Sequence, residues 1–235
     1  MRYALYFAPE PGSPLADLAN AWLGRDPATG REVAHPDLVG VGPDELAAIT
    51  AAPRRYGFHG TLKAPFRLAD GVAKGDLIDK MAEFCAVTPG FDVPALKLSL
   101  LDGFLAMTLA EASEALDRFA DEVVRFFDPL RAPLTPTDIA RRNPEALSPA
   151  ELRNLESWGY PYVFDCFQYH MTLSARLDDG TARRVLAIAA EYFAPVLDRP
   201  VAIDALTLFV EPAPGAPFEI HSRVPLLSGR ERKTA

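Results

Sequence analysis

The chain has 235 residues, of which 49% are hydrophobic and 24% are charged, and its formal net charge is −8 at pH 7. This composition is typical of a globular protein with enough chain for a substantial core, and it excludes a disordered protein. The acidic balance disfavours long-range attraction of a polyanion such as RNA. A small anionic substrate held by a few local cations remains compatible with it.

Cysteine and hydropathy patterns narrow the class further. The only cysteines, Cys85 and Cys166, are far apart, with no Cys-x-x-Cys and no histidine cluster at zinc spacing, which predicts buried, reduced thiols and no metal site. Residues 1–7 form a short apolar run that prolines soon follow, which predicts a strand and not a signal peptide. No run approaches the roughly 18 apolar residues of a membrane span, so we expect a cytoplasmic protein.

The first part of the chain predicts strands and helices in alternation. In chain order these are a strand at 2–8, a helix at 14–23, a short helix at 43–50, a strand at 56–68 that breaks at Pro65, a helix at 74–87, and strands at 91–101 and 103–109. Ser13 as N-cap, Pro14 at the first position and Gly24 after the end delimit the first helix. The turn Asp102-Gly103 is a strong hairpin signal.

The second part of the chain predicts a similar order around an insertion. The elements are a helix at 110–127, a strand at 167–177, a helix at 181–197, and strands at 201–210 and 218–224. The insertion at 128–165 is rich in proline and contains one helix, for which Ser148, Pro149 and Glu151 form a capping box. Such an insertion serves either as a lid over a site or as an arm that covers a sheet edge.

The order of strand, helix, strand and strand therefore occurs twice. The opening strand and helix of the first half have a counterpart in the helix at 110–127 and a strand that the sequence does not place. We interpret this as an architectural duplication with lobes at 1–110 and 111–227, strands exchanged between them, and a flexible tail at 228–235. A pseudo-twofold relation predicts that the two lobes meet at a central groove.

Two of the four histidines occur in the same short pattern, His59-Gly60-Thr61-Leu62 and His170-Met171-Thr172-Leu173. In each copy the histidine and threonine are two residues apart, so on a β-strand both side chains leave from one face. Two such strands would offer a phosphoryl group two imidazoles for proton transfer and two hydroxyls for its non-bridging oxygens. The plainer alternative is a pair of strand histidines, each beside a threonine that favours β-structure.

Longer strings extend this pattern to most of the chain. They are residues 2–9 (RYALYFAP), 56–66 (YGFHGTLKAPF) and 158–162 (WGYPY). With the paired motifs, they resemble the two-histidine (2H) phosphoesterase superfamily, which includes 2',3'-cyclic phosphodiesterases, bacterial RNA ligases and U6 processing enzymes. They look like the branch encoded beside bacterial phosphonate-utilisation (carbon–phosphorus lyase) operons.

The resemblance implies a bilobal, antiparallel α+β fold with the active site in the groove between the lobes. It also implies metal-independent cleavage of a phosphodiester, with His59, Thr61, His170 and Thr172 as the functional residues. Because carbon–phosphorus lyase pathways pass through ribose 1,2-cyclic phosphate 5-phosphate, that ester or a close analogue is the expected substrate, and no cofactor is expected.

For the mechanism, one imidazole is expected to be neutral and to take a proton from water, while the other is cationic and protonates the leaving oxygen. Unperturbed histidine pKa values near 6.5 then predict a bell-shaped rate profile. Which histidine is the base stays open. Neither His35 nor His221 is followed by threonine at the second position, so both are expected to be structural or surface residues.

Further candidates would bind the rest of the substrate. Lys63 is expected on the face of His59 and Thr61, where it would compensate phosphate charge or, alternatively, lie in solvent at the strand end. The tyrosines that would pack on a ribose or, alternatively, anchor the core are Tyr56, Tyr160 and Tyr162. Arg141 and Arg142 would reach a 5-phosphate if the insertion closes.

Three other functions stay open at this point. RNA end processing at a 2',3'-cyclic phosphate would need a basic track lined by aromatic residues, which the acidic balance disfavours. A non-catalytic module would keep the histidines only as ligands for a nucleotide or phosphate. Metal-dependent hydrolysis lacks a third ligand at usable spacing. The oligomeric state is not predicted.

Overall fold

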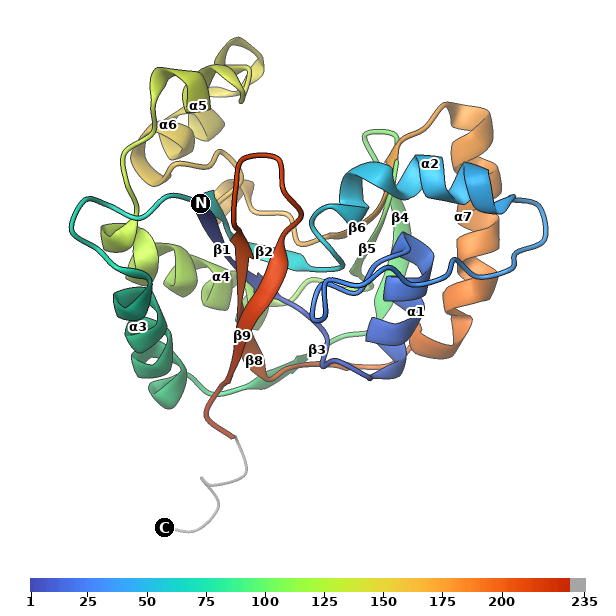
Figure 1. Cartoon of the computed structure of the whole chain (residues 1–235), viewed down its shortest axis with the longest axis horizontal. Helices are drawn as coiled ribbons and strands as arrows, with labels where there is room; N and C mark the ends of the chain where they lie inside the picture. The colour runs from blue at the N-terminus through green and yellow to red at the C-terminus, as the bar shows by residue number, and fades with distance from the viewer. Residues whose placement is uncertain (229–235) are drawn as a thin grey trace.

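The computed structural model describes residues 1–228 and has an α+β fold, as expected. A central sheet has the strand order β4-β5-β6-β2-β1-β8-β9, and every neighbouring pair is antiparallel (Figure 1). Its strands are β1 (Arg2–Phe7), β2 (Gly60–Phe66), β4 (Leu96–Leu101), β5 (Phe104–Leu109), β6 (Met171–Arg176), β8 (Ala205–Glu211) and β9 (Glu219–Pro225). Two short strands, β3 (Phe91–Val93) and β7 (Val201–Ile203), form a separate antiparallel pair.

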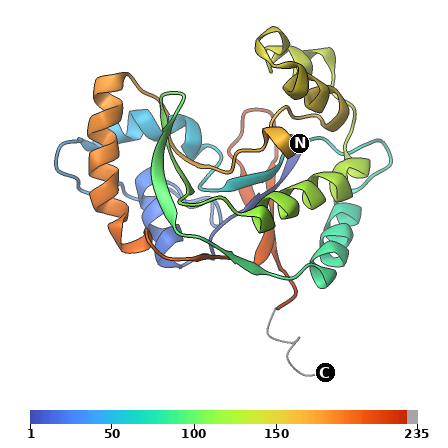
Figure 2. The same ribbon diagram turned by 180° about the vertical axis from the view of Figure 1, so that it is seen from behind.

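Helices pack beside each half of the sheet. They are α1 (Pro14–Leu23), α2 (Pro43–Arg54), α3 (Lys74–Val87), α4 (Glu114–Phe127), α5 (Pro136–Ala140), α6 (Pro149–Trp158) and α7 (Asp179–Phe193). Helices α1, α2 and α7 pack near β4, β5 and β6, whereas α3 and α4 pack near β2, β8 and β9 (Figure 2). The short helices α5 and α6 lie in a segment that projects from one corner of the molecule (Figures 1 and 2).

Several local signals in the sequence have the expected structure. The Ser13 hydroxyl accepts a hydrogen bond from the backbone N–H of Ala16, and Gly24 ends α1 in the left-handed conformation. The Ser148–Glu151 capping box forms at the start of α6. Asp102 and Gly103 both have positive φ, as a tight two-residue hairpin requires.

Other element boundaries differ from the expectation. Helix α2 continues to Arg54, and α4 starts only at Glu114 because Ser113 caps it. The last helix ends at Phe193 and a 3-10 turn follows it. The expected strands at 91–101 and 201–210 are each divided into a three-residue strand and a longer one, because β3 and β7 leave the main sheet and pair with each other.

The expected break of the first motif strand at Pro65 is wrong. Strand β2 runs through Pro65 to Phe66, and its pairing with β1 shifts register twice along this stretch. Proline is tolerated there because a position beside a bulge or on a strand edge needs no donor for the ladder.

The order of elements suggests which strand of the second half corresponds to the opening strand of the first half, a question that the sequence leaves open. When α2 and the insertion helices α5 and α6 are left aside, the order β1-α1-β2-α3-β3-β4 is followed by β5-α4-β6-α7-β7-β8. In the sheet, β2 is followed outward by β1 and β8, and β6 by β5 and β4. We therefore propose β5 as the counterpart of β1, with β4 and β8 exchanged between the repeats. The lobe boundary at residue 110 stays a prediction, and residues 229–235 of the predicted tail lie outside the described residues.

The two motif strands are neighbours at the centre of the sheet. Gly60 of β2 pairs with Met171 of β6, which joins one half of the sheet to the other. On the core side, the ring of Tyr169 lies directly against Gly60, where an added Cβ would be 2.4 Å from the nearest ring atom. Only glycine allows this contact without displacement of the strand or the ring.

We expect Gly60→Ala to lower the free energy of unfolding by about 1–3 kcal/mol, because Tyr169 or β2 must move to accept the methyl group. Urea unfolding followed by circular dichroism measures the change. Gly75→Ala is the matched control, because a Cβ at Gly75 meets nothing within 4 Å. A loss for Gly60→Ala no larger than that for the control would contradict the packing argument.

Candidate active site

The four motif side chains lie on one face of the central strand pair. Because β2 and β6 are antiparallel and Gly60 is opposite Met171, His59 lies next to Thr172, and Thr61 lies next to His170. Gly60 and Met171 point to the opposite face, where Met171 is buried in the core. The structure thus brings the two motifs together, with each imidazole beside the hydroxyl of the other motif.

Both imidazoles are held by the same local hydrogen bond. His59 Nδ1 lies 2.8 Å from the carbonyl oxygen of Gly57, and His170 Nδ1 lies 2.8 Å from that of Gln168. Because a carbonyl oxygen only accepts, each Nδ1 carries a proton. The Nε2 atom of each ring is therefore left for proton exchange with a ligand.

The surroundings of His59 favour its neutral form. Its ring stacks on Tyr6 with 3.9 Å between centroids, and the rings of Phe209 and Tyr56 lie at 6.0 and 6.1 Å. Burial, together with a smaller effect of the nearby His170, lowers the pKa of His59 to about 4 against the opposing effect of the Gly57 carbonyl. At neutral pH, His59 is therefore a proton acceptor.

The two threonines are half-buried and available to a ligand. Within residues 1–228, neither Thr61 nor Thr172 has a protein hydrogen-bond partner for its hydroxyl, whereas the neighbouring Ser174 hydroxyl is bonded to backbone groups of Leu105 and Ala175. The motif therefore presents two unoccupied hydroxyls on the same face as the two Nε2 atoms.

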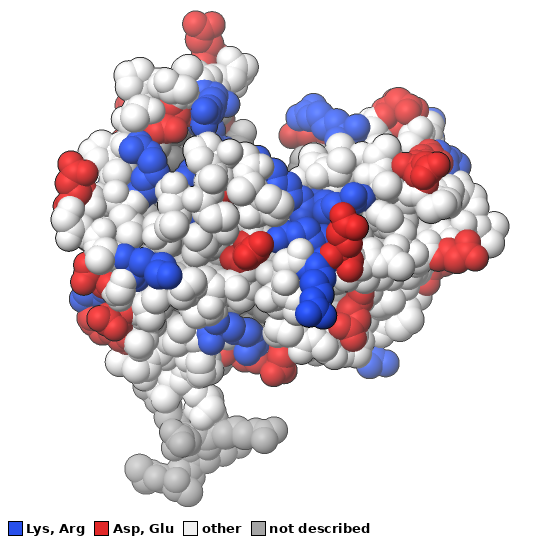
Figure 3. All heavy atoms as spheres, viewed as in Figure 1, with Lys and Arg blue, Asp and Glu red and all other residues white. Residues whose placement is uncertain are grey.

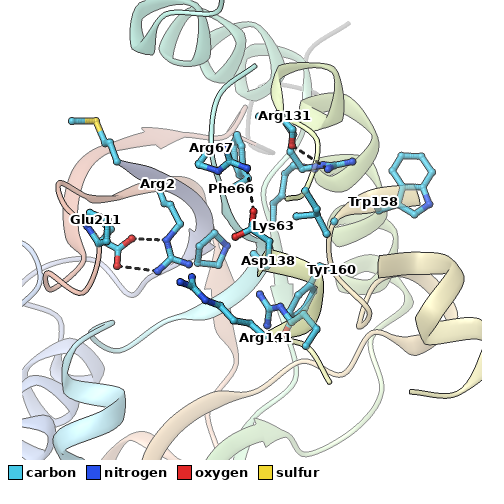
Figure 4. Close-up of a pocket in the computed structure, with 18 of the residues that line it drawn as sticks. Arg2, Lys63, Phe66, Arg67, Arg131, Asp138, Arg141, Trp158, Tyr160 and Glu211 are labelled. Carbon is cyan, nitrogen blue, oxygen red and sulfur yellow. Dashed lines mark hydrogen bonds and ion pairs between the residues drawn. The ribbon is translucent and has the colours of Figure 1, made fainter. Parts of the chain in front are cut away.

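A cavity of about 560 Å³ lies beside the second half of β2. Its walls come from β1, β2, the end of α4, the end of β8 and the segment around α5 and α6. Seven cationic side chains line it: Arg2, Arg55, Lys63, Arg67, Arg131, Arg141 and Arg142. Figure 4 shows several of these converging on the same space, and Figure 3 shows Lys and Arg side chains beside the notch between the α5–α6 segment and α2.

Three carboxylates hold most of these cations. Glu211 is 1% exposed and pairs with Arg2 and Arg55. Burial acts to raise the pKa of Glu211, but the hydrogen bond from Arg2 and the nearby positive charges outweigh it, so the pKa is lowered. Asp128 and Asp138 hold three further cations: Lys63 at 3.0 Å, Arg131 at 2.8 Å and Arg67 at 3.1 Å.

The expectation that Lys63 shares the face of His59 and Thr61 is wrong. A register shift in β2 makes Lys63 the partner of Leu5, whose side chain belongs to the core, whereas Thr61 is the partner of Tyr6. The ammonium of Lys63 donates to Asp128 and to the carbonyl of Val124 at the end of α4. Lys63 lines the cavity, but its charge is largely compensated by protein groups.

The other candidate binding residues divide into two groups. Tyr56, Tyr160, Arg141 and Arg142 line the cavity. Tyr162 does not line it: its ring is exposed and packs edge-on against Tyr160.

Sequence reasoning missed several residues of the site. These are Tyr6, Arg2, Arg55, Arg67, Arg131 and Glu211. Alternation along β1 would have placed Arg2 and Tyr6 on one face, but no local pattern indicates that β1 lies next to β2.

The remaining histidines and both cysteines lie outside the site. His35 Nδ1 lies 3.1 Å from the Trp22 carbonyl, and His221 contacts the exposed Lys74. Cys85 and Cys166 are unpaired, and Cys166 is only half-buried. In the described part of the chain, no group of three His, Cys, Asp or Glu side chains is placed to hold a metal, and no helix has the length and apolar character needed to cross a membrane.

Comparison with known proteins identifies the family. Residues 61–219 match the family described as "Protein of unknown function (DUF1045)". The chain belongs to this family. The matched residues include Thr61, His170, Thr172 and the whole segment around α5 and α6.

Two curated relatives carry an enzyme name. The chain is 39% identical over 235 residues to "Ribose 1,5-bisphosphate phosphokinase PhnN" of Janthinobacterium sp. (strain Marseille), and 36% identical over 227 residues to the protein of that name in Laribacter hongkongensis (strain HLHK9). These matches cover 98% and 97% of this chain but 52% of each relative, so the chain spans about half the length of these proteins.

A crystal structure of a phosphoesterase is also similar, with a TM-score of 0.41, 13% identity, and coverage of 96% of this chain and 98% of that chain. At this level of similarity, the match supports no functional argument.

The pKa of His59 is directly measurable. We expect its ring to stay neutral from pH 8 to about 5.5 in NMR spectra of the free protein, and to become protonated only as the pH falls through about 4. Because folding disfavours the protonated ring, His59 also makes folding stability fall as the pH drops from 6.5 through about 4.

Tyr6→Ala is the comparison variant, because it opens the stacked face of the ring to water and should raise the pKa of His59 toward 6.5. The His59→Gln spectrum assigns the resonance. A wild-type titration midpoint near 6.5 would contradict the burial argument.

Proposed function

We propose that this protein is a 2H phosphoesterase that opens a small cyclic phosphodiester by acid–base catalysis with two histidines. The observation that carries the proposal is the arrangement of His59, Thr61, His170 and Thr172 on one face of adjacent strands, with both Nδ1 atoms bound to backbone carbonyls. This arrangement leaves two Nε2 atoms and two hydroxyls for one phosphoryl group.

In the proposed reaction, His59 is the base, because burial keeps its ring neutral. Its Nε2 takes a proton from water while the water oxygen forms a bond to phosphorus. The bond from phosphorus to a sugar oxygen breaks, and the protonated His170 donates its Nε2 proton to that oxygen. Thr61 and Thr172 donate hydrogen bonds to the non-bridging oxygens, which gain negative charge as water adds.

The proposed substrate is ribose 1,2-cyclic phosphate 5-phosphate or a close ribosyl analogue. The name of the curated relatives supports it: cleavage between phosphorus and O2 of this ester would give ribose 1,5-bisphosphate, the compound in that name. This chain has no Gly-x-x-x-x-Gly-Lys-Ser/Thr loop, the usual phosphate-binding loop of many kinases. We therefore assign the named kinase activity to the half of those proteins that this chain does not match, and ester opening to this half.

The test is hydrolysis of a panel of cyclic phosphates in chelating buffer, with the product position read by phosphorus NMR. We expect ribose 1,2-cyclic phosphate 5-phosphate to be opened at O2. His59→Ala and His170→Ala should each lower kcat by about 10²–10⁴-fold, the usual contribution of a general acid or base. His221→Ala, which changes an exposed histidine outside the site, is the control.

Other results would favour other functions. Faster turnover of oligonucleotides with 2',3'-cyclic ends would favour RNA processing. Binding without turnover, weakened but not abolished in the alanine variants, would favour a non-catalytic module. Loss of activity in chelator would favour metal-dependent hydrolysis.

A further inference from the structure

The cationic cavity beside the motif face has no role in the proposed proton transfers. It concentrates seven cations in a protein whose net charge is −8, and three carboxylates hold only five of them. Confined like charges repel one another, so such a cluster destabilises the folded protein unless an anion enters. The charges therefore indicate an anionic ligand.

The carboxylates hold some cations in place and leave others free to bind. Glu211, Asp128 and Asp138 hold Arg2, Arg55, Lys63, Arg131 and Arg67. Among residues 1–228, Arg141 and Arg142 have no carboxylate partner, and the guanidinium of Arg142 lies 4.8 Å from the centroid of the Tyr160 ring. Figure 4 shows Arg141 beside the space that Arg2 and Arg67 also border. Both unpaired arginines come from the insertion, at the end of α5.

The cavity lies beside the histidine face, and none of the four motif residues is among those that line it. Tyr56 lines the cavity, and its ring centroid lies 6.1 Å from that of His59. Tyr6, which stacks on His59, is also near the cavity: burial raises the pKa of its hydroxyl, and Tyr56, Tyr160, Arg2 and Arg142 are close enough to act on it. A ligand with its reacting group at His59 would therefore extend past Tyr56 into the cavity.

We propose that this cavity binds a phosphomonoester on the same molecule as the cyclic phosphodiester, with Arg141 and Arg142 as its specificity-determining ligands. The inference rests on the proposed function for the reacting end of the substrate. A phosphomonoester is a dianion with three acceptor oxygens, which suits several guanidinium groups that donate in pairs. The cavity volume of about 560 Å³ accommodates a phosphorylated sugar. On this view, the insertion at 128–165 selects the substrate.

The first test compares two substrates that differ only in the second phosphate: ribose 1,2-cyclic phosphate with and without the 5-phosphate. We expect the wild-type kcat/KM ratio to favour the phosphorylated ester by about 100-fold or more, because the ester without the 5-phosphate makes no hydrogen bonds to the unpaired guanidinium groups. Arg141→Ala and Arg142→Ala should each lower this ratio about tenfold. Arg141→Lys, which keeps the charge but loses the paired donors, should give an intermediate ratio.

Arg118→Ala is the matched control, because it removes one positive charge from an exposed position on α4, outside the cavity. We expect this variant to keep the wild-type ratio. An unchanged ratio in the Arg141 and Arg142 variants, or a wild-type ratio near one, would overturn the proposal.

The second test measures binding without catalysis. Calorimetry with ribose 5-phosphate, which has no cyclic ester, should show binding at one site. We expect the double variant Arg141→Ala/Arg142→Ala to lower the affinity about tenfold or more, and added salt to lower it too. If the protein binds ribose 5-phosphate in this way but opens no cyclic phosphate, the proposed function fails and the cavity assignment stands. If it opens cyclic phosphates but does not bind ribose 5-phosphate, the cavity assignment fails. Tighter, arginine-dependent binding of an oligonucleotide would overturn it in favour of a nucleic acid.

Discussion

The contact of β2 with β6 at Gly60 and Met171 determines the position of everything else in the candidate site. It joins the two halves of the sheet and places the motif residues crosswise on one face. Tyr169 fixes this contact from the core side, since its ring occupies the volume that a side chain at residue 60 would need. The residue between His59 and Thr61 therefore contributes by the absence of a side chain. Without the contact of β2 with β6, the positions of the two imidazoles relative to one another would not be fixed.

A second constraint on the candidate site is the pairing of the cavity's cations with carboxylates. Although the protein is acidic overall, its cavity is lined by cations, and a few carboxylates pair with them. One of these carboxylates, Glu211, is almost fully buried and pairs with Arg2 and Arg55. A buried carboxylate is itself costly, and two guanidinium groups and the backbone N–H of Gly215 offset that cost. The anchored arginines then have fixed directions, which makes the cavity ready for an anion before one arrives.

Much of the fold and the central part of the site could be predicted from sequence because they depend on local patterns. Caps such as Ser13 and Ser148, the Asp102-Gly103 turn and the alternation of His59 with Thr61 act over a few residues. The errors concern features that distant strands decide. Lys63 leaves the expected face because β2 shifts register against β1, and the strand expected at 91–101 divides because β3 pairs with β7. The site residues of β1 and β8 carry no signal of their own, since only the sheet order brings them to the motif strands.

The sheet order also has a consequence for how the protein reaches its native state. Strand β1 completes its pairing only with β8, where Leu5 lies opposite Leu208, so β1 lacks one neighbour until the chain has been synthesised as far as β8. Contacts between residues so distant in sequence raise the contact order and slow folding. An incomplete chain would leave one edge of β1 without hydrogen-bond partners, a condition that favours association with other chains. During synthesis, protection of β1 therefore depends on β8, which follows it much later in the sequence.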